Sequence, residues 1–266
     1  MACVELSKVV KKEQGFSLFE IAIAVAIMGA LLYGLASIIR VDIDYEDYRD
    51  NKALVQTAKG ALMAYVQSNN FLPCPDTDGD GVENRNANRT CVAAQGALPH
   101  IDLGVAERDP WNNPLLYAVT PNATTLANLI DANDAASYFN NDVVTTGEPF
   151  FNINTPPFSN AAYAGALFIC GENAAVCGGA TPAADLIEIA GLAVIVSFGK
   201  NGTQSWGNIT ATNNTAISEV ENLDSDNYFL RAMGSNNVNG FDDELAWITG
   251  FDVKFALVRS DDSLGD

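Results

Sequence analysis

Ten residues near the N-terminus decide how the chain is interpreted: Lys11-Lys12-Glu13-Gln14-Gly15-Phe16-Ser17-Leu18-Phe19-Glu20. They lead into residues 16–39, a run in which Glu20 is the only charged side chain. As a helix that rises 1.5 Å per residue, this run is about 36 Å long, enough to span a bilayer with some tilt. The lysines that precede it predict a cytoplasmic N-terminus by the positive-inside rule.

Glu20 is unusual in this run, because a carboxylate near the end of a helix in lipid costs about 1–3 kcal/mol and needs a partner. One interpretation is a membrane anchor whose acid lies at the level of the headgroups. The other is that the chain is cut after Gly15, so that the new amine of Phe16 is a cation for Glu20 to meet. A secretory signal peptide fits less well, because its apolar core is only about 7–15 residues long.

The basic leader, Gly15, Phe16, Glu20 and the long apolar helix together resemble the class III signal of the type IV pilin and type II secretion pseudopilin family. The resemblance implies that prepilin peptidase cuts between Gly15 and Phe16, that Phe16 is N-methylated, and that Glu20 serves assembly with other pilin or pseudopilin subunits. It also implies a single-pass inner-membrane protein whose C-terminal domain lies in the periplasm before it joins a pilus or pseudopilus filament.

The helix is expected to continue through residues 41–70, where apolar side chains recur at steps of three and four residues, at Leu54, Ala58, Ala61, Leu62 and Tyr65. Pro73 should end it. The predicted fold class is α+β: a long N-terminal helix, with a membrane half and an amphipathic half, packs on an antiparallel β-sheet with large loop insertions. The segments are a leader (1–15), a transmembrane or filament-core helix (16–40), its amphipathic half (41–70) and a globular pilin-like domain (71–266).

Within residues 71–266, apolar runs at 115–119, 166–170, 187–198 and 251–258 predict strands. A short helix is expected over 125–136. Residues 120–165 and 203–240 are otherwise rich in Asn and Thr and predict long loops. The turn at residues 109–114 contains Trp111, which we expect to anchor it on the core.

Cys3 lies in the leader, which leaves Cys74, Cys91, Cys170 and Cys177. Their spacing does not match zinc-ligand pairs. Since disulfides persist outside the cytoplasm, the simplest of the three possible pairings is Cys74–Cys91 with Cys170–Cys177.

Residues 76–81, Asp-Thr-Asp-Gly-Asp-Gly, place three carboxylates around one point, which suits the oxygen-binding ion calcium. Position 87 is alanine, so a full EF-hand is excluded, and Glu83 or Asn84 would have to complete a shorter site. A solvated turn is the alternative to calcium binding by Asp76, Asp78 and Asp80. A second candidate site, Asp242 with Asp243, follows from a resemblance of residues 197–199 and 242–243 to the calcium-binding loop of the major pseudopilins.

The 266 residues include 33 acidic and 14 basic side chains, and a formal net charge of −19 disfavours nucleic acid as a partner. His100 is the only histidine, and no catalytic set or phosphate-binding glycine loop accompanies it, so we do not expect an enzyme. The predicted function is that of a pilin-like structural subunit, a minor one given its size. The alternative is a tip-located adhesin or substrate-binding module on the same filament.

Overall fold

The computed structural model describes residues 17–140, 151–156, 167–171, 174, 177–202, 221–223, 226–231 and 242–259, without the side chains of residues 35–44 and 201. The chain divides into two compact units, Met1–Glu46 and Asp47–Asp266. One helix, α1 (Leu18–Asn69), contributes residues to both units.

The second unit combines short helices with a six-stranded sheet, which makes the chain α+β as predicted. The strands are β1 (Gln95–Ala97), β2 (Leu116–Val119), β3 (Leu167–Cys170), β4 (Leu186–Ser197), β5 (Tyr228–Leu230) and β6 (Glu244–Thr249). The α-helices after α1 are α2 (His100–Leu103), α3 (Leu126–Leu129) and α6 (Gly250–Arg259). The 3-10 helices are η1 (Pro121–Thr124), η2 (Ala135–Phe139), η3 (Ala183–Asp185) and η4 (Gly199–Asn201).

The sheet is mainly antiparallel and runs in the order β1-β2-β4-β3-β5, with β6 also paired to β4. Only β3 and β5 pair in parallel among the described strands. The long strand β4 is the centre: it pairs with β2, β3 and β6. Its apolar, β-branched sequence explains this position, because such side chains fit a strand that is covered on both faces.

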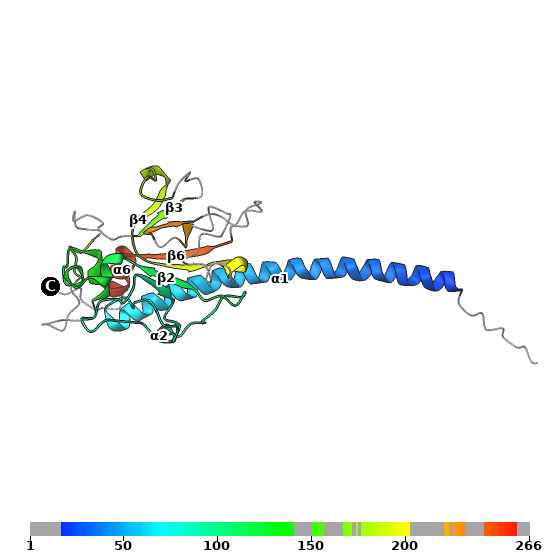
Figure 1. Cartoon of the computed structure of the whole chain (residues 1–266), viewed down its shortest axis with the longest axis horizontal. Coiled ribbons are helices and arrows are strands. Elements are labelled where there is room, and N and C mark those ends of the chain that lie inside the picture. Colours follow the sequence, from blue (N-terminus) through cyan, green and yellow to red (C-terminus); the bar gives the residue numbers. More distant parts are fainter. Residues whose placement is uncertain are drawn as a thin grey trace, which may run out of the picture. The chain divides into compact units, whose positions relative to one another are not determined.

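The second half of α1 lies along one face of the sheet (Figure 1). Val55, Ala58, Leu62 and Val66 are fully buried there, at the three- and four-residue steps of a helical stripe. Burying each of the larger side chains stabilises the fold by about 1.5–3 kcal/mol. Helix α1 ends at Asn69, ahead of Pro73, as expected from the sequence.

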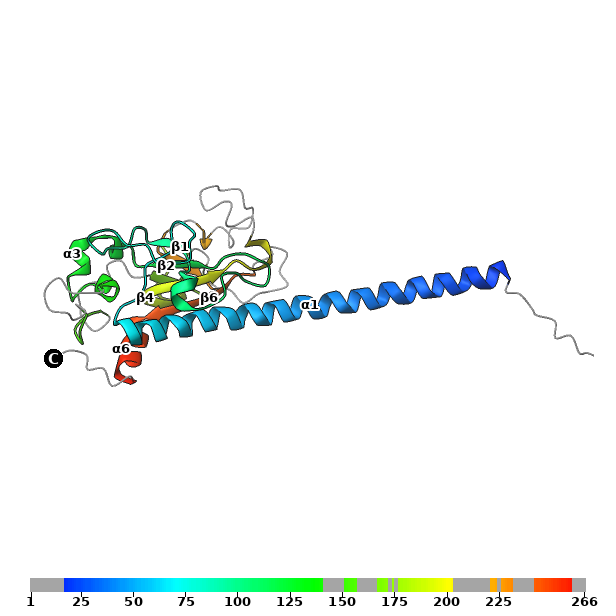
Figure 2. The same cartoon turned by 90° about the horizontal axis from the view of Figure 1, so that it is seen from below.

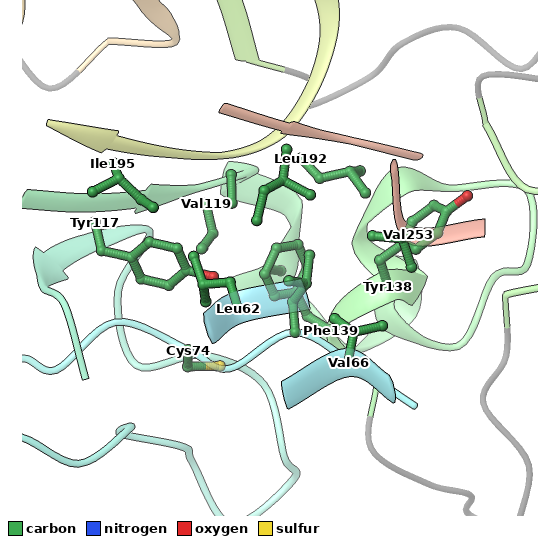
Figure 3. Close-up of a cluster of buried hydrophobic side chains, with 14 of the residues drawn as sticks. Leu62, Val66, Cys74, Tyr117, Val119, Tyr138, Phe139, Leu192, Ile195 and Val253 are labelled. Carbon is green, nitrogen blue, oxygen red and sulfur yellow. The ribbon is translucent and has the colours of Figure 1, made fainter. Parts of the chain in front are cut away.

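The main core fills the space between α1 and the sheet (Figure 3). Leu62 lies beside Tyr117 of β2, and Val66 lies beside Phe139 in the same cluster. A second apolar cluster covers the opposite face of the sheet, where its members include Ile169, Val194 and Phe229. The sheet is therefore the middle layer of this unit.

The predicted last strand at 251–258 is wrong, because these residues form helix α6 beside the C-terminal end of α1 (Figure 2). The helix begins with a reciprocal cap: the hydroxyl of Thr249 accepts the amide of Asp252 at 3.2 Å, and the carboxylate of Asp252 accepts the amide of Thr249 at 2.9 Å. Its buried side chains, among them Val253, Ala256 and Leu257, then recur with helical spacing.

Other segments differ in detail from the prediction. In place of the helix expected over 125–136, the structure has the four-residue helix α3 and the start of the 3-10 helix η2. Strand β5 lies within a segment that the sequence predicted as a loop, and the three-residue strand β1 was not predicted.

The expectation of a single-pass inner-membrane location is wrong. Among the described residues, no helix carries an apolar stretch that is long enough to cross a membrane. The predicted membrane half of α1 is therefore not supported by the described residues either.

Candidate assembly helix and metal loop

A reciprocal cap fixes the start of α1. The Ser17 hydroxyl accepts the amide of Phe19 at 3.2 Å, while the Glu20 carboxylate accepts the amide of Ser17 at 2.9 Å. Such a capping box satisfies two amides that a helix start otherwise leaves unpaired. Glu20 thus has a local role that the sequence analysis did not identify, although the spacing Ser-x-x-Glu signals it. The predicted processing residues Gly15 and Phe16 lie outside the described residues.

The first part of α1 exposes apolar side chains on all sides. Exposed fractions reach 88% at Leu18 and 81% at Tyr33, and none of the large apolar side chains between them falls below 44%. They are Phe19, Ile21, Ile23, Val25, Ile27, Met28, Leu31 and Leu32. A helix that is apolar all round is normally covered, because water does not solvate such a surface favourably.

The carboxylate loop, residues 76–81, is built around Asp76, whose side chain is 3% exposed. Asp76 Oδ1 accepts the amides of Asp78 at 3.1 Å and Gly79 at 2.7 Å, and Oδ2 accepts the amide of Gly81 at 2.8 Å. Positive φ angles of 83° and 85° at Gly79 and Gly81 allow this tight path. One carboxylate oxygen each from Asp76, Asp78 and Asp80 lies within 4.8 Å of the others. This spacing suits a shared cation, so the structure brings the three predicted ligands together.

Residues expected to complete that site have other contacts. Glu83 Oε2 accepts the amide of Cys74 and the Nε of Arg85, both at 2.8 Å. Asn84 Oδ1 accepts the amide of Thr77 at 2.6 Å. Both side chains therefore brace the loop in this structure.

Arg85 joins the carboxylate loop to the rest of the unit. Its guanidinium donates to the carbonyl oxygens of Leu72 at 3.0 Å, Phe139 at 2.6 Å and Arg89 at 2.9 Å. It also lies 4.9 Å from the ring centroid of Phe71. The ion pair with Glu83 is largely buried, with side-chain exposures of 11% for Arg85 and 17% for Glu83.

Both predicted disulfides are confirmed. Cys74 bonds to Cys91 and Cys170 bonds to Cys177, at sequence separations of 17 and 7. Closing loops of these lengths is worth about 2–4 kcal/mol in the chain-entropy model. The first disulfide encloses the carboxylate loop and fixes both of its ends.

Asp242 and Asp243 bind different partners. Asp242 Oδ2 accepts the amide of Lys200 at 2.7 Å, whereas Asp243 Oδ2 accepts the side-chain amide of Asn222 at 2.7 Å. Burial raises the pKa of Asp242, and the nearby carboxylate of Asp109 raises it further. Among the described residues, the cluster of possible metal ligands contains Asp76, Asp78 and Asp80 and neither of these two acids.

The turn at residues 109–114 is held from inside by Asp109. Its Oδ1 accepts the amides of Trp111 at 3.0 Å and Asn113 at 2.8 Å, and its Oδ2 accepts the hydroxyl of Ser197 at 2.9 Å. Burial is the main cause that raises the pKa of Asp109. The ring of Trp111 packs edge-on against Tyr48 of α1, with 5.0 Å between the ring centroids. The turn thereby ties the sheet to α1.

No protein-family model matches the sequence, and the searches of curated proteins and of solved structures find no match either.

Proposed function

We propose that this protein is a pilin-like structural subunit of a type IV pilus or a type II secretion pseudopilus. Prepilin peptidase trims it between Gly15 and Phe16, and it assembles with other pilin or pseudopilin subunits through α1. The observation that supports this best is the exposed, all-round apolar surface of α1 between Leu18 and Tyr33. Like helices from neighbouring subunits cover such a surface, so the protein acts by assembly.

Glu20 is proposed to act twice in this process. Before assembly it caps its own helix through the Ser17 amide. In the filament its carboxylate also neutralises the Phe16 amine of a neighbouring subunit. Removing one partner of a buried ion pair strands the other charge, at a cost of roughly 3–5 kcal/mol.

Two substitutions separate these roles. Glu20→Val loses both the cap and the charge, whereas Glu20→Gln keeps an oxygen that can accept the Ser17 amide and loses only the charge. We expect both variants to be trimmed to Phe16 and both to be depleted from sheared filaments. Glu46→Gln, at an exposed acid on the same helix, is the matched control and should incorporate normally.

Immunoblots of sheared filaments and N-terminal sequencing provide the two measurements. Normal incorporation of Glu20→Gln would show that capping alone accounts for Glu20. An intact Met1 in filaments, or normal incorporation of Glu20→Val, would contradict the proposed function.

We also infer that the carboxylate loop binds calcium through Asp76, Asp78 and Asp80. The support is the spacing of their oxygens and the rigid path that the Asp76 hydrogen bonds impose. Three carboxylates this close repel one another, and a divalent cation removes that repulsion. Isothermal calorimetry with Ca²⁺ on wild type and on Asp78→Ala tests the site, and equal heats would rule it out.

A further inference from the structure

Met28 lies in the apolar surface of α1 between Leu18 and Tyr33, and it is 62% exposed. Its thioether is the group in this surface that peroxides attack most readily, because sulfur carries lone pairs that hydrocarbon side chains lack. Met63, the other methionine among the described residues, is partly buried and packs against the main core. A small oxidant therefore reaches Met28 much more easily than Met63.

The helix surface around Met28 offers no hydrogen-bond donor. Residues three and four positions away lie on the same face of a helix, and here they are Ala24, Val25, Leu31 and Leu32. None of these side chains holds a donor, and the main-chain amides within α1 are engaged in the helix. In the proposed assembly, like segments of neighbouring copies cover this surface and bring mainly apolar side chains as well. A polar atom added at position 28 is thus buried there without a hydrogen-bond partner.

We propose that Met28 is a reversible oxidation site that decides whether the chain enters an assembly. Hydrogen peroxide is the oxidant: its O–O bond breaks, one oxygen bonds to the Met28 sulfur, which gives up two electrons, and the other oxygen leaves in water. The product is a methionine sulfoxide, which is polar and chiral. A methionine sulfoxide reductase reverses the step, as two thiols become a disulfide and the sulfoxide oxygen leaves in water. The inference rests on the proposed function, because it needs a neighbouring copy of α1 to cover this surface.

Oxidation acts before assembly. In a single copy water solvates the sulfoxide oxygen, so the helix tolerates it. Once a neighbouring copy covers position 28, the same oxygen loses its water and gains no donor, which weakens association by about tenfold or more. The covering helices also keep peroxide away from the sulfur, so a completed assembly resists the oxidant that stops a free subunit.

The test follows the sulfoxide into new filaments formed by the full chain. Existing filaments are sheared off, the cells receive a pulse of hydrogen peroxide, and the filaments that grow afterwards are separated from the unassembled chain. Peptide mass spectrometry then measures the fraction of sulfoxide at Met28 and at Met63 in both pools. We expect the sulfoxide at Met28 to be at least about tenfold rarer in the filaments. The sulfoxide fraction at Met63, the internal control, should not differ between the two pools.

Three variants complete the test. Met28→Leu keeps an apolar side chain of similar volume that peroxide does not oxidise, so its incorporation into filaments should not respond to peroxide. Met28→Gln carries a polar side chain permanently and should be depleted from filaments about tenfold without any oxidant. Met63→Leu should respond to peroxide like wild type.

Equal fractions of Met28 sulfoxide in the two pools, or normal incorporation of Met28→Gln, would overturn this inference and leave the proposed function intact. Absence of the wild-type chain from filaments would refute the proposed function, and this inference with it.

Discussion

Replacing Arg85 by Met should destabilise the second unit by about 3–5 kcal/mol, because it leaves the Glu83 carboxylate largely buried without its cation. Met keeps much of the side-chain volume, so the loss reports on the charge and its hydrogen bonds. Three carbonyl oxygens, of Leu72, Arg89 and Phe139, also lose their donor. An exposed ion pair would instead contribute about 0–1 kcal/mol, so the measurement discriminates between the two cases.

Urea unfolding of residues 47–266, followed by circular dichroism with the disulfides intact, measures this change. With a slope of about 2–3 kcal/mol/M, the transition midpoint should fall by about 1–2.5 M. Glu83→Gln and the double variant complete a thermodynamic cycle. The double variant should be less destabilised than the sum of the single variants, since it removes both charges together.

Arg49→Met is a matched control, because Arg49 pairs with Asp50 at the surface and both side chains are more than 60% exposed. It should leave the midpoint almost unchanged. A loss of less than about 1 kcal/mol for Arg85→Met, or strict additivity in the cycle, would refute the view that this ion pair holds the loop in place.

Leu62→Ala should lower the free energy of unfolding by about 2–5 kcal/mol, because Leu62 is fully buried between α1 and the sheet. Gly60→Ala is its control: a Cβ at Gly60 would meet no atom within 4 Å, and alanine favours the helix, so this change should not destabilise the unit. Calcium at 100 times its dissociation constant should stabilise the wild-type unit by about 2.7 kcal/mol in thermal melts, and Asp78→Ala should reduce that gain. Burial lowers the pKa of Lys254 from 10.5 to about 8 in the folded chain. Between pH 8 and 10.5 the unfolded chain therefore binds more protons at this residue than the folded chain does, and the free energy of unfolding should rise with pH. Lys254→Met should flatten this rise in urea titrations at pH 7.5 and 9.5, and an unchanged slope would argue against the shift.

Residue patterns that repeat over many positions predicted the structure well. The apolar stripe at Ala58 and Leu62 correctly placed the second half of α1 on the core, and the run at 187–198 matches β4 within one residue at each end. In α1 the burial of many side chains favours the same helix that the apolar spacing predicts, and in β4 it favours the same strand. The disulfides followed from the number of cysteines and the expected compartment.

Short elements depended on contacts that the sequence does not display. The apolar run at 251–258 indicated a strand, but the cap between Thr249 and Asp252 starts a helix there. Strand β1 has the sequence Gln-Gly-Ala, which has little strand preference, and it forms because β2 and Asp76 bind its two edges. The spacing of the carboxylate loop was visible in the sequence, whereas the burial of Asp76 was not.

The Cys74–Cys91 bond also determines how a pull on the N-terminus travels through the second unit. The part of a tension along α1 that the packing on the sheet does not take up passes beyond Asn69 and reaches Cys74 within a few residues. There the covalent bridge transfers it directly to Cys91, shortly before β1 carries it into the sheet. The residues between the two cysteines, including Asp76, Asp78 and Asp80, lie on a branch that the force bypasses. A covalent path from the end of α1 to β1 therefore runs in parallel with the carboxylate loop.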